Sequence, residues 1–118
     1  MELDKLREFC ISKIGVTEEF PFNEDTLVFK VCGKMFCLLN LVPPHSINVK
    51  CDPEKAISLI EEFEEIIPGY HMNKKHWITV SMSGTLTNKF ILGLVKDSYD
   101  LVFSNISEKI KKELKIRQ

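Results

Sequence analysis

The residues that decide the fold run from Leu27 to Asn40 and read LVFKVCGKMFCLLN. Two apolar runs flank Gly33-Lys34, and a two-residue link that begins with glycine is typical of a tight β-hairpin. In the simplest register, Cys32 pairs with Met35 and Lys30 pairs with Cys37. That register predicts one core-facing set of side chains, made of Leu27, Phe29, Val31, Phe36 and Leu38.

Helices and further strands are predicted on both sides of this hairpin. Asp52-Pro53 combines an N-cap acid with a proline suited to the first helical position, so a helix should begin there. The expected order is helix 2–14 ending near Gly15, at most an edge strand at 20–22, hairpin 27–40, strand 46–50, helix 53–65, strand 77–82, helix 87–103 and a short basic helix 108–117. A hairpin without regular βαβ alternation favours an α+β fold, with an antiparallel sheet packed by helices.

Length and composition predict one globular domain spanning residues 1–118, because 44% of the residues are hydrophobic and 28% are charged. No apolar run approaches the roughly 20 residues of a membrane span. The charged N-terminus, Met-Glu-Leu-Asp-Lys, lacks the apolar segment of a secretory signal, so we expect a cytoplasmic protein. None of the four cysteines forms a C-x-x-C pair, which predicts reduced, mostly buried thiols. We expect a monomer.

The lysines are segregated along the chain. The net charge of −1 excludes a strongly basic protein and counts against nucleic-acid binding at the level of the whole chain. However, Thr26–Cys51 contains three lysines and no acid, and Ile66–Lys96 contains four lysines and no acid. If these segments meet in space, one face of a nearly neutral molecule is positive.

Catalytic and metal-binding motifs are absent from the sequence. It contains no G-x-S-x-G, P-loop, G-x-G-x-x-G or H-E-x-x-H pattern. The paired acids between Glu61 and Glu65 should face solvent at a helix end, without the burial that raises the pKa of a general acid. His71 and His76 are five residues apart, and the cysteines lack the spacing of a zinc knuckle. We therefore expect neither an enzyme nor a bound metal or cofactor, although some proximity of cysteine and histidine stays open.

The segment Tyr70–Trp77, YHMNKKHW, has the most unusual composition in the chain. Lysine and protonated histidine neutralise phosphates, asparagine bonds to bases or phosphates, and aromatic rings stack on bases. The alternative is a surface turn in which Tyr70 and Trp77 fill the core and the lysines are merely solvated. Lys34, at the hairpin tip, fits both interpretations.

Six motifs together resemble the MmcQ/YjbR-like family of small bacterial proteins. Their order and spacing span about residue 3 to about residue 105, and they are 21–26, 28–31, 33–36, 47–53, 67–77 and 98–102. The resemblance implies a fold of the CyaY/frataxin type and binding of duplex DNA by two β-hairpin wings, the "double wing". Frataxin-like iron binding is not implied, because the first helix holds only Glu2, Asp4 and Glu8 as acids. The basic tail, 106–118, lies outside the shared motifs.

The leading hypothesis is therefore non-catalytic binding of double-stranded DNA. The candidate contacts are Lys30, Lys34, Lys50, His71, Asn73, Lys74, Lys75, His76, Trp77 and Lys89. The alternative, motivated by the near-zero net charge, is a protein-interaction or small-ligand module with Tyr70 and Trp77 as anchors.

Overall fold

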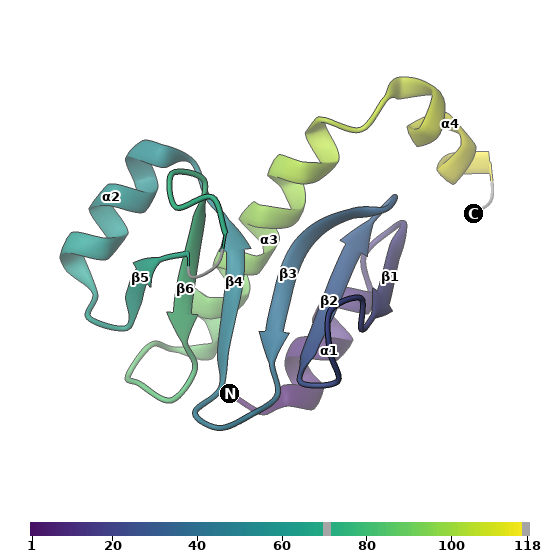
Figure 1. The fold of residues 1–118 in the computed structure, drawn as a ribbon. Coiled ribbons are helices and arrows are strands. Elements are labelled where there is room, and N and C mark those ends of the chain that lie inside the picture. The colour runs from purple at the N-terminus through teal and green to yellow at the C-terminus, as the bar shows by residue number, and fades with distance from the viewer. Residues whose placement is uncertain (70–71, 117–118) are drawn as a thin grey trace.

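The strands between Val16 and Ser81 form one antiparallel sheet (Figure 1). The computed structural model describes residues 1–69 and 72–116, and in these residues the strand order is β1-β2-β3-β4-β6-β5. The strands are β1 Val16–Glu19, β2 Thr26–Val31, β3 Lys34–Asn40, β4 Ser46–Lys50, β5 Ile66–Pro68 and β6 Trp77–Ser81. The predicted α+β fold with an antiparallel sheet is confirmed.

Two helices cover one face of the sheet. Figure 1 shows α1 and α3 behind the strands, α2 beside β5 and β6, and α4 beyond the turn that joins β2 and β3. The helices are α1 Leu3–Ile11, α2 Pro53–Glu62, α3 Asn88–Ser104 and α4 Glu108–Ile116. The side chain of Asp52 accepts the N–H of Lys55 and that of Thr87 accepts the N–H of Phe90, so α2 and α3 both begin at N-caps. In the part of the chain that the structure describes, no helix has the length and apolarity to cross a membrane.

The main core lies between the sheet and α1 and α3. Phe29, Phe36, Ile47 and Ile78 are fully buried there. A smaller cluster lies on the opposite side of the sheet, which we call the open face. It consists of Val28, Leu38 and Trp77, with Met35 and Met72 packed against them.

The β2–β3 hairpin corrects the predicted register. The turn residues are Cys32 and Gly33, with φ of 50° and 81°, the left-handed backbone that a tight two-residue turn requires. Val31 pairs with Lys34, Lys30 with Met35, and Phe29 with Cys37, so both predicted pairs, Cys32–Met35 and Lys30–Cys37, are wrong. Phe36 is an extra residue at a bulge, which interrupts the alternation of side chains. As a result Leu38 lies on the open face with Val28, and not on the predicted core face.

Both edges of the sheet differ from the expectation. The first edge strand is β1 and not residues 20–22, whose Phe20 and Phe22 are 52% and 62% exposed. Glu18 of β1 forms an ion pair with Arg7, at 2.6 Å between Oε1 and Nη2. The second edge is β5, which was not predicted, because α2 ends at Glu62 and leaves room for a short strand that stops at Pro68.

The backbone pairing between β3 and β4 ends at Cys37 and Val49, and past this pair the two strands separate. Ser98 of α3 is fully buried at this point. Its Oγ donates to the carbonyl of Phe36 at 2.6 Å and accepts the N–H of Lys50 at 2.8 Å. The hydroxyl therefore joins two strands that no longer bond to each other, and it fixes the backbone that carries Lys50.

Tyr99 anchors the segment between α1 and β1, since its hydroxyl donates to the carbonyl of Ile14 at 2.6 Å. Burial raises the pKa of Tyr99 to about 12. An unfolded tyrosine ionises near pH 10, so the free energy of unfolding should not depend on this group below pH 10 and should fall between pH 10 and pH 12. Titration of the phenol absorbance should show one ionisation near pH 12 that is missing in Tyr99→Phe. Ionisation of Tyr99 near pH 10 in the folded protein would contradict this.

Candidate functional site

Strand pairing places the turn before β6 next to the end of β4. Lys50 pairs with Trp77, and the N–H of Cys51 donates to the carbonyl of His76 at 2.8 Å. The exposed Lys74 and Lys75 lie in that turn. Lysines that are 24 and 25 residues apart from Lys50 in sequence thus come to the same end of the open face.

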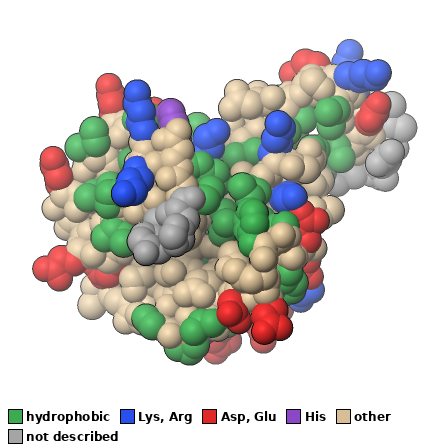
Figure 2. Space-filling model, viewed as in Figure 1, with side chains coloured by type: hydrophobic (Ala, Val, Ile, Leu, Met, Phe, Trp, Pro, Cys, Tyr) green, Lys and Arg blue, Asp and Glu red, His purple; other side chains and the backbone are tan. Residues whose placement is uncertain are grey.

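The β2–β3 hairpin brings Lys34 to the same end of the sheet, where Lys34 pairs with Val31 of the main core and so begins on the helix-covered side. Lys34 and Lys50 line one pocket of about 260 Å³, together with Trp77 and the C-terminal end of α3. We call Lys34, Lys50, Lys74, Lys75 and His76 the basic end. Figure 2 shows basic side chains and a histidine across the upper part of this face, with acidic side chains at its left, lower and right margins.

The lysines of the basic end are not held in ion pairs by the described residues. Among the described residues, none of its four lysines forms an ion pair with a carboxylate, whereas Lys30, Lys55 and Lys96 each do. Unpaired ammonium groups keep their attraction for an external anion. This end of the sheet is therefore suited to phosphate groups.

Three predicted contacts do not join the basic end. Lys30 lies on the open face, but its ammonium is paired with Glu19. Lys89 is exposed in the first turn of α3, where it lines a hollow with Lys55 and Asp97 in the helix layer, away from the open face. His71 lies outside the described residues.

Asn73 and Trp77 have structural roles in the same segment. The side-chain oxygen of Asn73 accepts the N–H of Lys75 at 3.0 Å, and its carbonyl accepts the N–H groups of His76 and Trp77. Trp77 is only 9% exposed and packs on Val28. The core-filling interpretation holds for Trp77, whose ring is too buried to anchor a partner protein.

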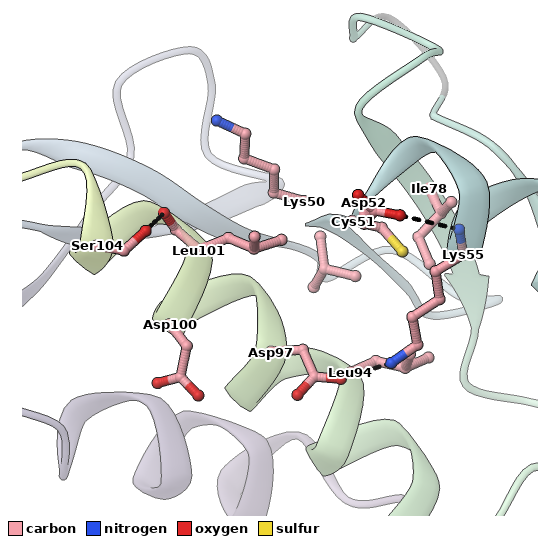
Figure 3. Close-up of a pocket in the computed structure, with 11 residues that line it drawn as sticks. Lys50, Cys51, Asp52, Lys55, Ile78, Leu94, Asp97, Asp100, Leu101 and Ser104 are labelled. Atoms are coloured by element: carbon pink, nitrogen blue, oxygen red, sulfur yellow. Dashed lines mark hydrogen bonds and ion pairs between the residues drawn. The ribbon is translucent and has the colours of Figure 1, made fainter.

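A second pocket, of about 380 Å³, lies between β4, α2 and α3 (Figure 3). The ammonium of Lys55 bonds to the carboxylate of Asp97 at 2.8 Å, and this hydrogen bond raises the pKa of Lys55. Burial raises the pKa of the Cys51 thiol, so it stays protonated and weakly nucleophilic at neutral pH. In Figure 3 the Lys50 ammonium points away from the Lys55–Asp97 pair, so Lys50 belongs to the basic end.

The other thiols lie in or near the core. A hydrogen bond with Cys10, together with burial, raises the pKa of Cys37. Among residues 1–69 and 72–116, no three histidine, cysteine or acidic side chains lie close enough to hold a metal ion.

Sequence reasoning missed Ser98 and the neutral polar side chains of the open face. The alternation of Ile47 and Val49 with Asn48 and Lys50 was the available signal, because alternate residues of a strand share a face. The role of Ser98 had no such signal, since its partners lie 48 and 62 residues away.

Known proteins resemble this chain over most of its length. It is 37% identical over 99 residues to the uncharacterized protein YbdF of Escherichia coli O157:H7, which covers 81% of this chain and 80% of that protein. It is 28% identical over 115 residues to the uncharacterized protein YjbR of Escherichia coli strain K12, with 97% and 98% covered.

Solved structures share the fold. The crystal structure of Deinococcus radiodurans protein DR2400, with its DUF419 domain, has a TM-score of 0.88 and 38% identity over 95% of this chain and 86% of that one. The crystal structure of a Pseudomonas syringae protein has a TM-score of 0.75 and 30% identity, covering 86% of this chain and 99% of that one. The YjbR family model matches residues 11–101, and the chain belongs to the YjbR family.

Proposed function

We propose that this protein is a non-catalytic, monomeric, cytoplasmic DNA-binding protein whose basic end contacts the phosphate backbone. The observation that carries the proposal is the meeting of Lys34, Lys50, Lys74 and Lys75, from three segments, without a paired carboxylate among the described residues. Lysines of this kind release counterions from DNA when they neutralise phosphates, which makes binding favourable and dependent on salt.

The arrangement also supports duplex DNA as the form bound. Lys34 begins β3 directly after the hairpin turn, and Lys74 and Lys75 lie in the turn before β6. These two projections flank Lys50, so they can contact phosphates on either side of it. This agrees with the two wings that the family resemblance implies.

The test is the salt dependence of binding to a labelled duplex, measured by fluorescence anisotropy. Each lysine on a phosphate contributes about one unit to the slope of log affinity against log salt. The double variant Lys34→Gln/Lys50→Gln should lower the slope by about 2 and the affinity by about tenfold.

The matched control is Lys5→Gln/Lys89→Gln, which removes the same charge from exposed lysines of α1 and α3. It should leave the slope unchanged, because neither lysine belongs to the basic end. An equal loss in both double variants would mean that only net charge matters. Affinity that is flat between about 50 and 200 mM salt would refute phosphate binding.

A second candidate is small-ligand binding, which the pocket of Figure 3 favours. Its wall is apolar at Ile78 and Leu94, and its rim carries charges of both signs, so it suits a small zwitterion. If this were the only function, the wild-type protein would bind no duplex at any salt concentration.

A further inference from the structure

The open face holds a third pocket, of about 530 Å³, within the range of roughly 300–1,000 Å³ that small-molecule sites occupy. It is lined by strand residues such as Leu38, Asn48 and Thr79 and by Phe22 from the loop before β2. None of the described residues that line it carries a charge. The part of a ligand that enters this pocket should therefore be uncharged.

Three asparagines in the pocket wall are oriented alike by their hydrogen bonds. The side-chain oxygen of Asn23 accepts the N–H of Asp25 at 2.9 Å, and that of Asn40 accepts the N–H of Val42 at 3.2 Å. The oxygen of Asn48 accepts the hydroxyl of Thr79 at 2.5 Å.

Each carboxamide oxygen thus accepts one hydrogen bond within the protein, which fixes the side of the amide that carries the NH₂ group. Among the described residues, nothing accepts from the three NH₂ groups, so these donors are left for a ligand. The pocket is consequently matched to a ligand rich in hydrogen-bond acceptors.

The apolar part of the wall suits a flat ring. Phe22 is 62% exposed, so its ring is accessible from solvent, and Leu38 is buried beneath the open face. Exposed aromatic side chains bind nucleobases by stacking. A flat, uncharged ring with carbonyl oxygens at its edge satisfies both the apolar wall and the three donors.

The pocket adjoins the basic end. Asn48 and Lys50 point to the same face of β4 and are two residues apart, as are Thr79 and Trp77 on β6. Two residues along a strand span about 7 Å. A phosphate at Lys50 and a ring beside Asn48 can therefore belong to a single nucleotide.

We propose that this pocket binds an unpaired nucleobase whose phosphate lies on the basic end, with thymine or uracil preferred. Their two ring carbonyls accept from the asparagine donors, and their single N–H can donate to the hydroxyl of Ser46 or Thr26, which also line the pocket. The inference rests on the proposed function, which supplies the phosphate contacts. The base comes from single-stranded DNA or from a free nucleotide.

The experiment compares a short oligothymidylate with an abasic oligomer of the same length. The two carry the same phosphates, so their difference isolates the base. Wild-type protein should bind the oligothymidylate about tenfold more tightly, the size of one stacked base. Phe22→Ala should remove this preference and leave the affinity for the abasic oligomer unchanged.

Phe20→Ala is the matched control, because Phe20 is similarly exposed and does not line the pocket. It should keep the preference. Asn48→Leu removes an NH₂ donor and keeps the Phe22 ring, and it should also abolish the preference for the oligothymidylate. Equal binding of both oligomers by wild-type protein would overturn the base pocket and leave the proposed function intact. If neither oligomer binds and the labelled duplex does, the base pocket fails and the proposed function stands; if the duplex does not bind either, both proposals fail.

A competition arm identifies the source of the base. Thymidine monophosphate that displaces the oligothymidylate at concentrations near the oligomer's own Kd would assign the pocket to a free nucleotide. Displacement only at concentrations at least about a hundredfold higher would assign it to single-stranded DNA, which gains from the remaining lysines.

Discussion

Replacing Ser98 with alanine should lower the free energy of unfolding by about 3 kcal/mol and the midpoint temperature by about 10 °C. The Ser98 hydroxyl serves the N–H of Lys50 and the carbonyl of Phe36 at once. Alanine would leave both groups buried without a partner, and each such group costs roughly 1–3 kcal/mol. Chemical denaturation followed by circular dichroism measures the change.

The control for this prediction lies on the same helix. Ser104 is exposed, and its hydroxyl bonds only to the carbonyl of Leu101 in its own helix. Ser104→Ala should change stability by less than about 0.5 kcal/mol. A loss below about 1 kcal/mol for Ser98→Ala would show that the gap between β3 and β4 does not depend on this hydroxyl.

Gly69→Ala should destabilise the fold by about 3 kcal/mol, at the upper end of the usual cost of overpacking. A β-carbon at Gly69 would lie 2.7 Å from Cβ of Trp77 and 2.9 Å from its backbone C and O. These atoms belong to a paired strand and cannot move aside as the end of a flexible side chain can. The substitution should also strain the bond from the Gly69 N–H to the Trp77 carbonyl.

The opposite effect on stability is expected at Gly93, where an added β-carbon meets nothing within 4 Å. Gly93 lies exposed in the interior of α3, so Gly93→Ala should stabilise the protein by about 0.5–1 kcal/mol. Thermal unfolding of the two variants provides a paired test. Equal effects of the two substitutions would mean that contact with Trp77 does not decide the result at Gly69.

Much of the fold follows from local patterns in the sequence. The N-cap at Asp52, the alternation along β4 and the helical spacing of α3 all depend on neighbouring residues. The predicted hairpin register was wrong because a bulge at Phe36 breaks the strict alternation of side chains that the prediction assumes. The strand β5 was missed because three residues ending in proline are too short for any periodic signal.

The candidate site was predicted in composition and only partly in geometry. The pairing of β4 with β6 brings Lys50 to the turn that holds Lys74 and Lys75. The two segments without acidic residues in the sequence suggested that these lysines could meet. The ion pair of Lys30 with Glu19 depends on the position of β1, which the sequence prediction had misplaced. The prediction that Lys89 joins these lysines was wrong. The orientation of a helix relative to a distant strand depends on tertiary packing, which the local sequence does not determine.

The two edge strands limit how other molecules can reach this protein. A long bare edge recruits strands from neighbouring chains and can seed fibrils. Here β1 carries two glutamates that are held in ion pairs, and β5 ends after three residues at Pro68, which has no N–H to offer. Growth of the sheet from chain to chain is therefore blocked at both sides, and a partner must dock on side chains.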